Sequence, residues 1–134
     1  MFSAFYGLHI NCGGNEITSN ETKYDADTWD TPGYYDSKNG WVSSNTGNFL
    51  DDDRTNNGKS KWSNSSELKI TNSSIDFRLY TQARLSAISL TYQALCLGKG
   101  NYTVNLHFAE IMFNEKNMYS NLGRRYFDIY VQVI

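Results

Sequence analysis

Apolar and polar residues alternate along two segments in the last third of the chain. In residues 101–113 the positions on one face of an extended backbone are Tyr102, Val104, Leu106 and Phe108. In residues 123–133 the corresponding inward positions are Phe127, Ile129, Val131 and Val133. A period of two is typical of a half-buried strand. Because a polar connection, residues 114–121, joins them, the two segments are predicted to be neighbouring antiparallel strands.

Shorter strands are expected elsewhere. Residues 8–12 are a short apolar run that ends in the turn Cys12-Gly13-Gly14, and residues 77–82 and 88–94 alternate apolar with polar positions. Residues 15–46 and 51–64 are rich in polar residues, and we expect long loops there. Helical periodicity is almost absent. The pattern therefore predicts one all-β domain over residues 1–134, an antiparallel β-sandwich or jelly roll of two packed sheets.

Composition and charge exclude several classes of function. The 134 residues carry a formal net charge of −2, and the pI is about 5.6. This leaves no basic footprint for nucleic acid or for electrostatic membrane docking. No apolar run approaches the ~20 residues of a spanning helix. Residues 1–8 lack the charged start and apolar core of a secretory signal, so the chain is expected to be cytosolic or a fragment of a longer protein.

Four blocks of sequence carry a family resemblance: Leu8–Gly14, Phe49–Arg54 and the two alternating segments. In this order they resemble the malectin domain in the extracellular part of plant leucine-rich-repeat receptor-like kinases, over nearly the whole chain. The resemblance implies the all-β fold and a place on the extracellular face of the plasma membrane. It implies a serine/threonine kinase domain outside these residues. It also implies that the chain is a fragment, incomplete at both ends.

Export would give meaning to the cysteines and to several asparagines. Cys12 and Cys96 are too few for a structural zinc site of their own. In an exported protein they could form one disulfide worth about 2–4 kcal/mol; the alternative is two buried free thiols. Asn-x-Ser/Thr glycosylation acceptors occur at Asn20, Asn64, Asn72 and Asn101. A chain so rich in Asn, Ser and Thr contains such triplets by chance as well, so export is inferred mainly from the resemblance.

Aromatic residues are the candidate ligand contacts. Ten tyrosines and three tryptophans suit carbohydrate recognition, since pyranose faces stack on rings while polar neighbours bind the hydroxyls. Core packing is the competing interpretation, and it is favoured for the tyrosines on predicted strands, Tyr92, Tyr102 and Tyr126. For the loop residues Trp62, Tyr34 and Tyr35 the two interpretations are evenly balanced.

The resemblance adds specific positions. Animal malectin is a lectin for glucosylated glycans, and one of its contact points is the turn after the Phe-Ala-Glu strand. In this chain Phe113 matches an aromatic contact of that turn, whereas Met112 stands in place of a tyrosine and offers apolar contact without a hydroxyl. Tyr80 and Tyr92 align loosely with other contact positions. The lectin's C-terminal aspartate has no counterpart, so its sugar specificity is not carried over.

Charged residues indicate no catalytic or metal site. The run Asp51–Arg54 lacks the spacing of an EF-hand and is typical of a solvated turn. Glu110 is expected to form a structural ion pair with Arg124 or Arg125, rather than to act with Asp128 as a glycosidase pair. The two histidines, His9 and His107, are expected to be sheet residues. We therefore expect no metal, no cofactor and no enzymatic activity in this chain.

These patterns favour an extracellular carbohydrate-binding module of a receptor-like kinase, which senses glycan or cell-wall ligands. The alternative is a protein-interaction domain whose aromatic loops bind a peptide or a co-receptor ectodomain. A concave, ring-lined groove with polar groups would favour sugar, whereas a flat aromatic patch would favour protein. Nucleic acid is not an expected partner, and this segment is not expected to contact the membrane.

Overall fold

The structure, a computed structural model, describes residues 6–29, 31, 33–36, 38–47, 61–63, 76–109, 111 and 126–131. Its strands are β1 (Ile10–Asn11), β2 (Ile17–Ser19), β3 (Thr22–Ala26), β4 (Gly33–Asp36), β5 (Trp41–Thr46), β6 (Lys61–Ser63), β7 (Gln82–Arg84) and β8 (Ser89–Ala94). One 3₁₀-helix, η1 (Phe77–Tyr80), precedes β7, and the described residues contain no α-helix. The predicted all-β class is therefore confirmed.

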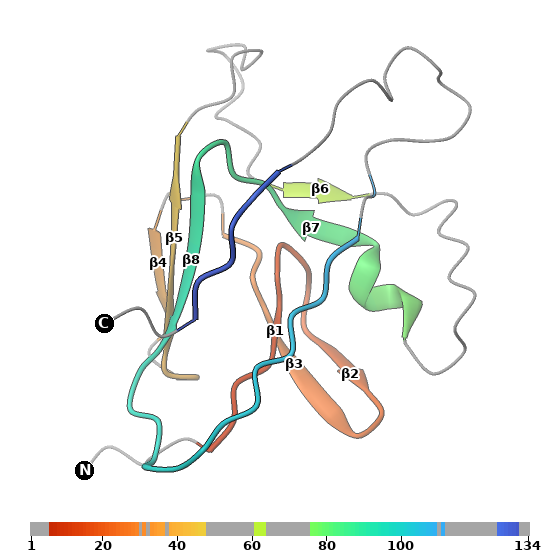
Figure 1. Cartoon of the computed structure of the whole chain (residues 1–134). Helices are drawn as coiled ribbons and strands as arrows, with labels where there is room; N and C mark the ends of the chain where they lie inside the picture. The colour runs from red at the N-terminus through yellow and green to blue at the C-terminus, as the bar shows by residue number, and fades with distance from the viewer. Residues whose placement is uncertain are drawn as a thin grey trace, which may run out of the picture.

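The strands pair in three small sheets (Figure 1). Their orders are β1-β3-β2, β4-β5-β8 and β6-β7. The pair β1–β3 is parallel, and the other four described pairs are antiparallel. The longest ladder joins β5 to β8, from Trp41 opposite Ala94 to Thr46 opposite Ser89. This ladder confirms the strand predicted at residues 88–94 and places β5 between β4 and β8.

The polar segment 15–46 was predicted as a loop, and this prediction is wrong, because the segment contains β2, β3, β4 and β5. Tight turns make the two hairpins possible. Asn20 and Glu21, both with positive φ, connect β2 to β3, and such left-handed pairs suit the twist of a two-residue hairpin. Between β4 and β5, the Asp36 carboxylate accepts hydrogen bonds from the backbone N–H groups of Lys38 and Asn39 at 2.8 and 3.0 Å. Backbone pairing therefore needs no apolar alternation here.

The strand predicted at residues 77–82 is also wrong, because residues 77–80 form η1. Asp76 caps this helix: its side chain accepts a hydrogen bond from the backbone N–H of Arg78 at 3.1 Å. Asp and Asn side chains favour such local bonds, which compete with a strand ladder. The following strand, β7, begins only at Gln82.

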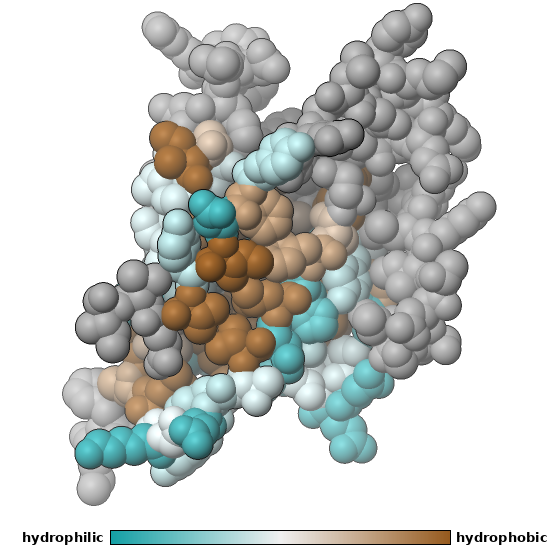
Figure 2. All heavy atoms as spheres, in the orientation of Figure 1, coloured by the Kyte–Doolittle hydropathy of each residue, from teal (hydrophilic) through white to brown (hydrophobic). Residues whose placement is uncertain are grey.

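The two strongly alternating segments differ most from expectation. Among the described residues, neither 101–109 nor 126–131 is assigned to a strand. Their apolar side chains are about half exposed, from 51% at Leu106 to 61% at Phe127. Both segments lie on the face toward the viewer in Figure 1, and Figure 2 shows hydrophobic side chains gathered on that face. We call this the exposed apolar face, made of Val104, Leu106, Phe108, Phe127, Ile129 and Val131.

The buried interior of the described part is small and partly polar. Trp41 is fully buried and Ile111 is 4% exposed, and these are its buried hydrophobic side chains. Three polar residues are buried beside them, Asn11, Ser19 and Asp27. Because buried polar groups need partners, the contacts of the fully buried Asp27 decide how the sheets are held together.

Candidate functional site

Asp27 is the centre of a buried cluster that joins three parts of the chain. One carboxylate oxygen, Oδ2, accepts hydrogen bonds from the Gly13 N–H at 3.0 Å, the Arg84 Nε–H at 2.9 Å and the Tyr92 hydroxyl at 2.6 Å. Arg84 Nη2 also pairs with the other oxygen, Oδ1. The N-terminal turn, β7 and β8 are therefore all fixed to the residue that follows β3. We call these four residues the Asp27 cluster.

Electrostatics within the cluster follow from burial and charge. Burial, then the neighbouring Cys12 and Asp27, raises the pKa of Tyr92 far above its usual value. Burial would lower the pKa of Arg84, but its hydrogen bond to Asp27 and the negative charge there raise it overall. Arg84 is thus a permanent cation whose side chain is only 4% exposed. A buried charge of this kind is tolerated only when it is paired and hydrogen-bonded, so we assign the cluster a structural role.

Gly13 lets the N-terminal turn approach β7. Its φ is +79°, and an added Cβ would lie 2.4 Å from the Ala83 carbonyl carbon and from the Arg84 nitrogen. Only glycine adopts this conformation and this distance without strain. Cys12 as a whole residue is exposed, but its thiol lies beside Tyr92, and the partial burial of the sulfur there raises its pKa.

Four aromatic rings extend from the Asp27 cluster to the surface. Tyr92 packs against the fully buried Trp41, with ring centroids 6.0 Å apart, and Trp41 meets Tyr34 edge-on at 5.7 Å. Tyr34 in turn stacks on Trp29 with centroids 4.1 Å apart and planes 16° apart. Trp29 is 44% exposed. We call Trp29, Tyr34 and Trp41 the aromatic tier.

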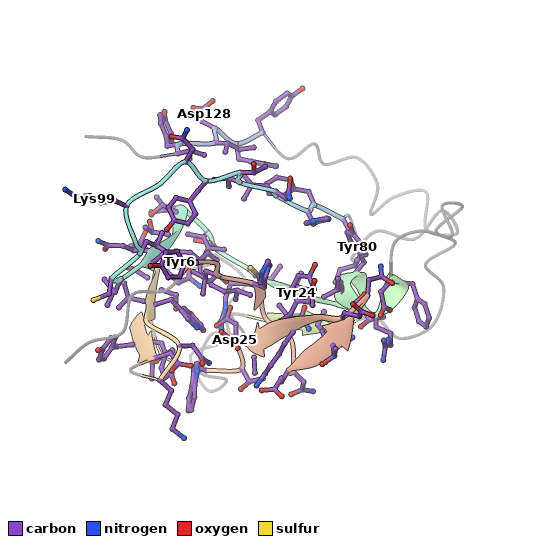
Figure 3. All side chains as sticks on the ribbon, turned by 90° about the horizontal axis from the view of Figure 1, so that it is seen from below. Tyr6, Tyr24, Asp25, Tyr80, Lys99 and Asp128 are labelled. Carbon is purple, nitrogen blue, oxygen red and sulfur yellow. The ribbon has the colours of Figure 1, made fainter. Side chains whose placement is uncertain are left out.

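Tyr80 and His107 make a second aromatic contact, away from this tier. The Tyr80 hydroxyl lies 2.7 Å from His107 Nδ1, and the two rings meet edge-on at 6.0 Å. Figure 3 shows Tyr80, the last residue of η1, directed toward the segment 101–109 that carries His107. In Figure 1, η1 and β4 lie on opposite sides of the molecule. The structure therefore separates two of the predicted sugar contacts, Tyr80 and Tyr34.

The remaining predicted contacts have different outcomes. Tyr92 uses its hydroxyl inside the Asp27 cluster, which favours core packing. Tyr35 is 57% exposed, on the face of β4 opposite to Tyr34. Met112, Phe113 and the side chain of Trp62 lie outside the described residues, as do Glu110, Arg124 and Arg125 of the predicted ion pair. These predictions stay predictions.

The predicted modification sites can be placed in part. Asn20, in the β2–β3 turn, and Asn101 are both exposed, whereas Asn64 and Asn72 fall outside the described ranges. Cys12 and Cys96 are free thiols in the structure, and the disulfide expected on export stays a prediction. Within the part of the chain that the structure describes, no three His, Cys, Asp or Glu side chains are grouped so that they could hold a metal ion. No helix there is long and apolar enough to cross a membrane.

Sequence reasoning missed four residues that organise these sites: Asp27, Trp29, Arg84 and His107. Asp27 and Trp29 lie in the polar segment that was taken for a loop, and Arg84 lies between two predicted strands. Their partners lie far along the chain, since Arg84 is 55 residues from Trp29 and Tyr92 is 65 residues from Asp27. No local sequence pattern connects residues at such separations. His107 was expected to be a sheet residue, and instead it contacts η1.

The described fold is all-β, and the chain belongs to the malectin domain family, whose family model matches residues 6–133. A probable LRR receptor-like serine/threonine-protein kinase of Arabidopsis thaliana is 58% identical over 96% of this chain. A second such kinase of the same plant is 47% identical over 95%. The chain spans 13% of the length of each. No solved structure gives a significant match.

The family assignment also shows where the kinase domain of the relatives lies with respect to this segment. The malectin match takes up residues 6–133 of 134, so the kinase domain named in the relatives lies outside this segment. The resemblance found from the sequence blocks is thereby confirmed, as is the expectation that this chain is not itself the enzyme.

Proposed function

We propose that this chain is a glycan-binding module in the extracellular part of a receptor-like kinase, where it senses cell-wall carbohydrate. The malectin family assignment supports a carbohydrate-binding role in general, and the receptor-like kinases among its relatives support an extracellular position.

The contact between Tyr80 and His107 carries the proposal. Tyr80 was a predicted sugar contact on η1, and His107 lies on the segment that leads to the other predicted contacts, Met112 and Phe113. The 2.7 Å contact brings these two separate stretches of sequence together at one exposed point. A ring with an accessible hydroxyl next to a second polar ring is the combination that sugar recognition requires.

The hydrogen bond also gives the pair a donor and an acceptor. If the Tyr80 hydroxyl donates to Nδ1, the imidazole carries its proton on Nε2 and can donate outward. The Tyr80 oxygen keeps lone pairs that can accept. A sugar hydroxyl both donates and accepts, so neighbouring hydroxyls of one pyranose can satisfy both groups. His107 thus has two tasks, orienting Tyr80 and binding the ligand.

A glycan array tests this function. The chain is probed beside Tyr80→Phe, which keeps the ring and removes the hydroxyl, and beside His107→Asn, whose amide oxygen replaces the Nδ1 acceptor. Saturable binding of one glycan class is expected, with about tenfold loss in Tyr80→Phe, a loss typical of one hydrogen bond to a buried or ordered partner. His107→Ala should lose as much, and His107→Asn should recover part of it.

The matched control is Tyr126→Phe, because Tyr126 is 82% exposed and lies on the other alternating segment. Its glycan binding should equal that of the unmodified chain. Absence of binding to every glycan, or equal binding by Tyr80→Phe and the control, would contradict the proposal.

One observation favours the alternative of a protein-interaction domain. The exposed apolar face presents six side chains that are each at least half exposed, and contiguous apolar surface of this kind often marks a protein-binding site. A co-receptor pull-down with Leu106→Ser and Phe127→Ser variants tests it. Capture of a defined partner that both substitutions abolish, together with a silent glycan array, would move the assignment to this function.

A further inference from the structure

We propose that Trp29 forms a second glycan-stacking site, on the side of the molecule opposite to Tyr80. This inference rests on the proposed carbohydrate function, but its residues and its position are independent of the Tyr80–His107 pair. Neither the resemblance nor the loop pattern singles out Trp29. The ligand is a pyranose ring within an oligosaccharide chain.

A hydrogen bond from Arg84 holds the backbone of Trp29 in place. Its carbonyl oxygen accepts a hydrogen bond from Arg84 Nη1 at 2.6 Å. Arg84 is itself fixed by Asp27, which is fully buried. Only Thr28 lies between Asp27 and Trp29, so the Asp27 cluster determines where the indole is attached.

Neighbouring aromatic rings hold the Trp29 indole in place. It stacks on Tyr34 at 4.1 Å, and Tyr34 rests edge-on against Trp41, which is fully buried. Trp29 is the outermost ring of this tier and remains 44% exposed. A large aromatic side chain that is both ordered and exposed can bind a flat ligand at low conformational-entropy cost, because its rotamer is already fixed.

Polar groups beside the ring suit a sugar. The Trp29 indole carries one N–H donor, which suits the oxygen of a ligand hydroxyl. The Asp36 carboxylate, on the same face of β4 as Tyr34, contributes with burial to the raised pKa of the Tyr34 hydroxyl. A single exposed indole offers far less than the ~800 Å² that each partner buries in a stable protein interface. Its size and chemistry therefore favour one pyranose ring over a protein surface.

The position of the tier has a consequence for the ligand. Since β4 and η1 lie on opposite sides in Figure 1, one sugar ring cannot contact both Trp29 and Tyr80. Two separate sites on one module would allow a long glycan chain, or two chains, to be held with greater avidity than either site gives alone.

The test uses the whole 134-residue chain, labelled with ¹⁵N, and cellohexaose as the probe. The three tryptophans give three indole N–H resonances, which are assigned with single Trp→Phe variants. During titration to millimolar cellohexaose, the Trp29 resonance should shift in a saturable way, while that of the buried Trp41 should move much less. Trp29→Ala should weaken binding at this site about tenfold, and Trp29→Phe, which keeps a ring on Tyr34, should weaken it less.

Titration of Tyr80→Phe distinguishes this inference from the proposed function. The Trp29 shift should persist in Tyr80→Phe with an unchanged midpoint. A shift at Trp29 without any response of the residues around Tyr80 would support the Trp29 site and contradict the proposed site at Tyr80. A Trp29 resonance that stays unmoved throughout the titration overturns the second site, even where the Tyr80 region responds.

Discussion

Two regions of the molecule reverse the usual expectation about what holds a fold together. The N-terminal turn, β3, β7 and β8 are rich in polar residues, yet they meet at the fully buried Asp27. The segments 101–109 and 126–131 have the clearest apolar alternation in the sequence, yet their described residues form no strand and stay half exposed. The comparison shows that alternation defines a face, whereas burial depends on having a partner for it.

The two regions differ because their partners differ in kind. A buried carboxylate needs particular donors at particular places, and Gly13, Arg84 and Tyr92 supply them. An apolar face needs only area, and almost any apolar surface can provide it. The polar cluster is therefore the specific part of this fold. Substitutions in the polar cluster should therefore lower the free energy of unfolding more than substitutions on the exposed apolar face.

Asp27→Asn should destabilise the chain most. It removes the charge that Arg84 is paired with and leaves a cation buried without compensation, which costs about 3–5 kcal/mol. The free energy of unfolding is measured by urea denaturation. Glu16→Gln is the control, because the Glu16–Lys23 pair has a similar bond of 2.9 Å but both side chains are more than half exposed. Equal effects of the two substitutions would refute a special role for the buried cluster.

Gly13→Ala should follow, with a loss of about 1–3 kcal/mol. The cause is twofold: φ is +79°, and the new Cβ would stand 2.4 Å from backbone atoms of β7. In Gly33→Ala, by contrast, the nearest atom, the Ser43 carbonyl oxygen, is 3.7 Å from the Cβ. Thermal melts of both variants measure the difference. If Gly13→Ala and Gly33→Ala had the same melting temperature, this would show that the turn can move away from β7.

Asp76→Asn should have a smaller effect that depends on pH. Hydrogen bonds from Arg78 are the main reason that the pKa of Asp76 is lowered to about 2, below an unfolded value of about 3.9. A lowered folded-state pKa contributes stability above pH ~4, which is lost as the pH falls from about 4 to 2. The Arg78 side chain is 54% exposed and that of Asp76 is 14% exposed, so solvent screens the pair in part and the contribution is modest.

Urea denaturation at pH 6 and at pH 2 measures this contribution. The gap in stability between the original chain and Asp76→Asn should be present at pH 6 and nearly closed at pH 2. A gap that widens on acidification would mean that the sign of the linkage is wrong.

Leu106→Ser should change the free energy of unfolding least, by about 0.5 kcal/mol or less. Leu106 is 51% exposed on the exposed apolar face, so the folded chain has little to lose there. Urea denaturation again provides the number, and Trp41→Ser, at a fully buried position, is the contrasting variant. A loss at Leu106 comparable to that at Trp41 would show that this face is covered in solution, and the contrast between the two regions would disappear.

The fold class and the family could both be predicted from the amino-acid sequence. The near-absence of helical periodicity argued against α-helices, and the blocks Leu8–Gly14 and Phe49–Arg54 with the two alternating segments pointed to the malectin domain, which the family match confirms. The strand at residues 88–94 was also predictable, because its alternation is local, and β5 pairs with it along Ser89–Ala94. Properties that depend on near neighbours in the chain were thus accessible.

Which distant residues contact one another could be seen only in the folded structure. Asp27 finds Arg84 and Tyr92 at separations of 57 and 65 residues, and Tyr80 finds His107 at 27. Tertiary structure also decided that residues 77–80 become a 3₁₀-helix, since the Asp76 cap outweighs a short alternating pattern. The reason is physical: period and propensity act over a few residues, whereas burial of a charge or exposure of a ring depends on contacts between segments that the chain brings together only when it folds.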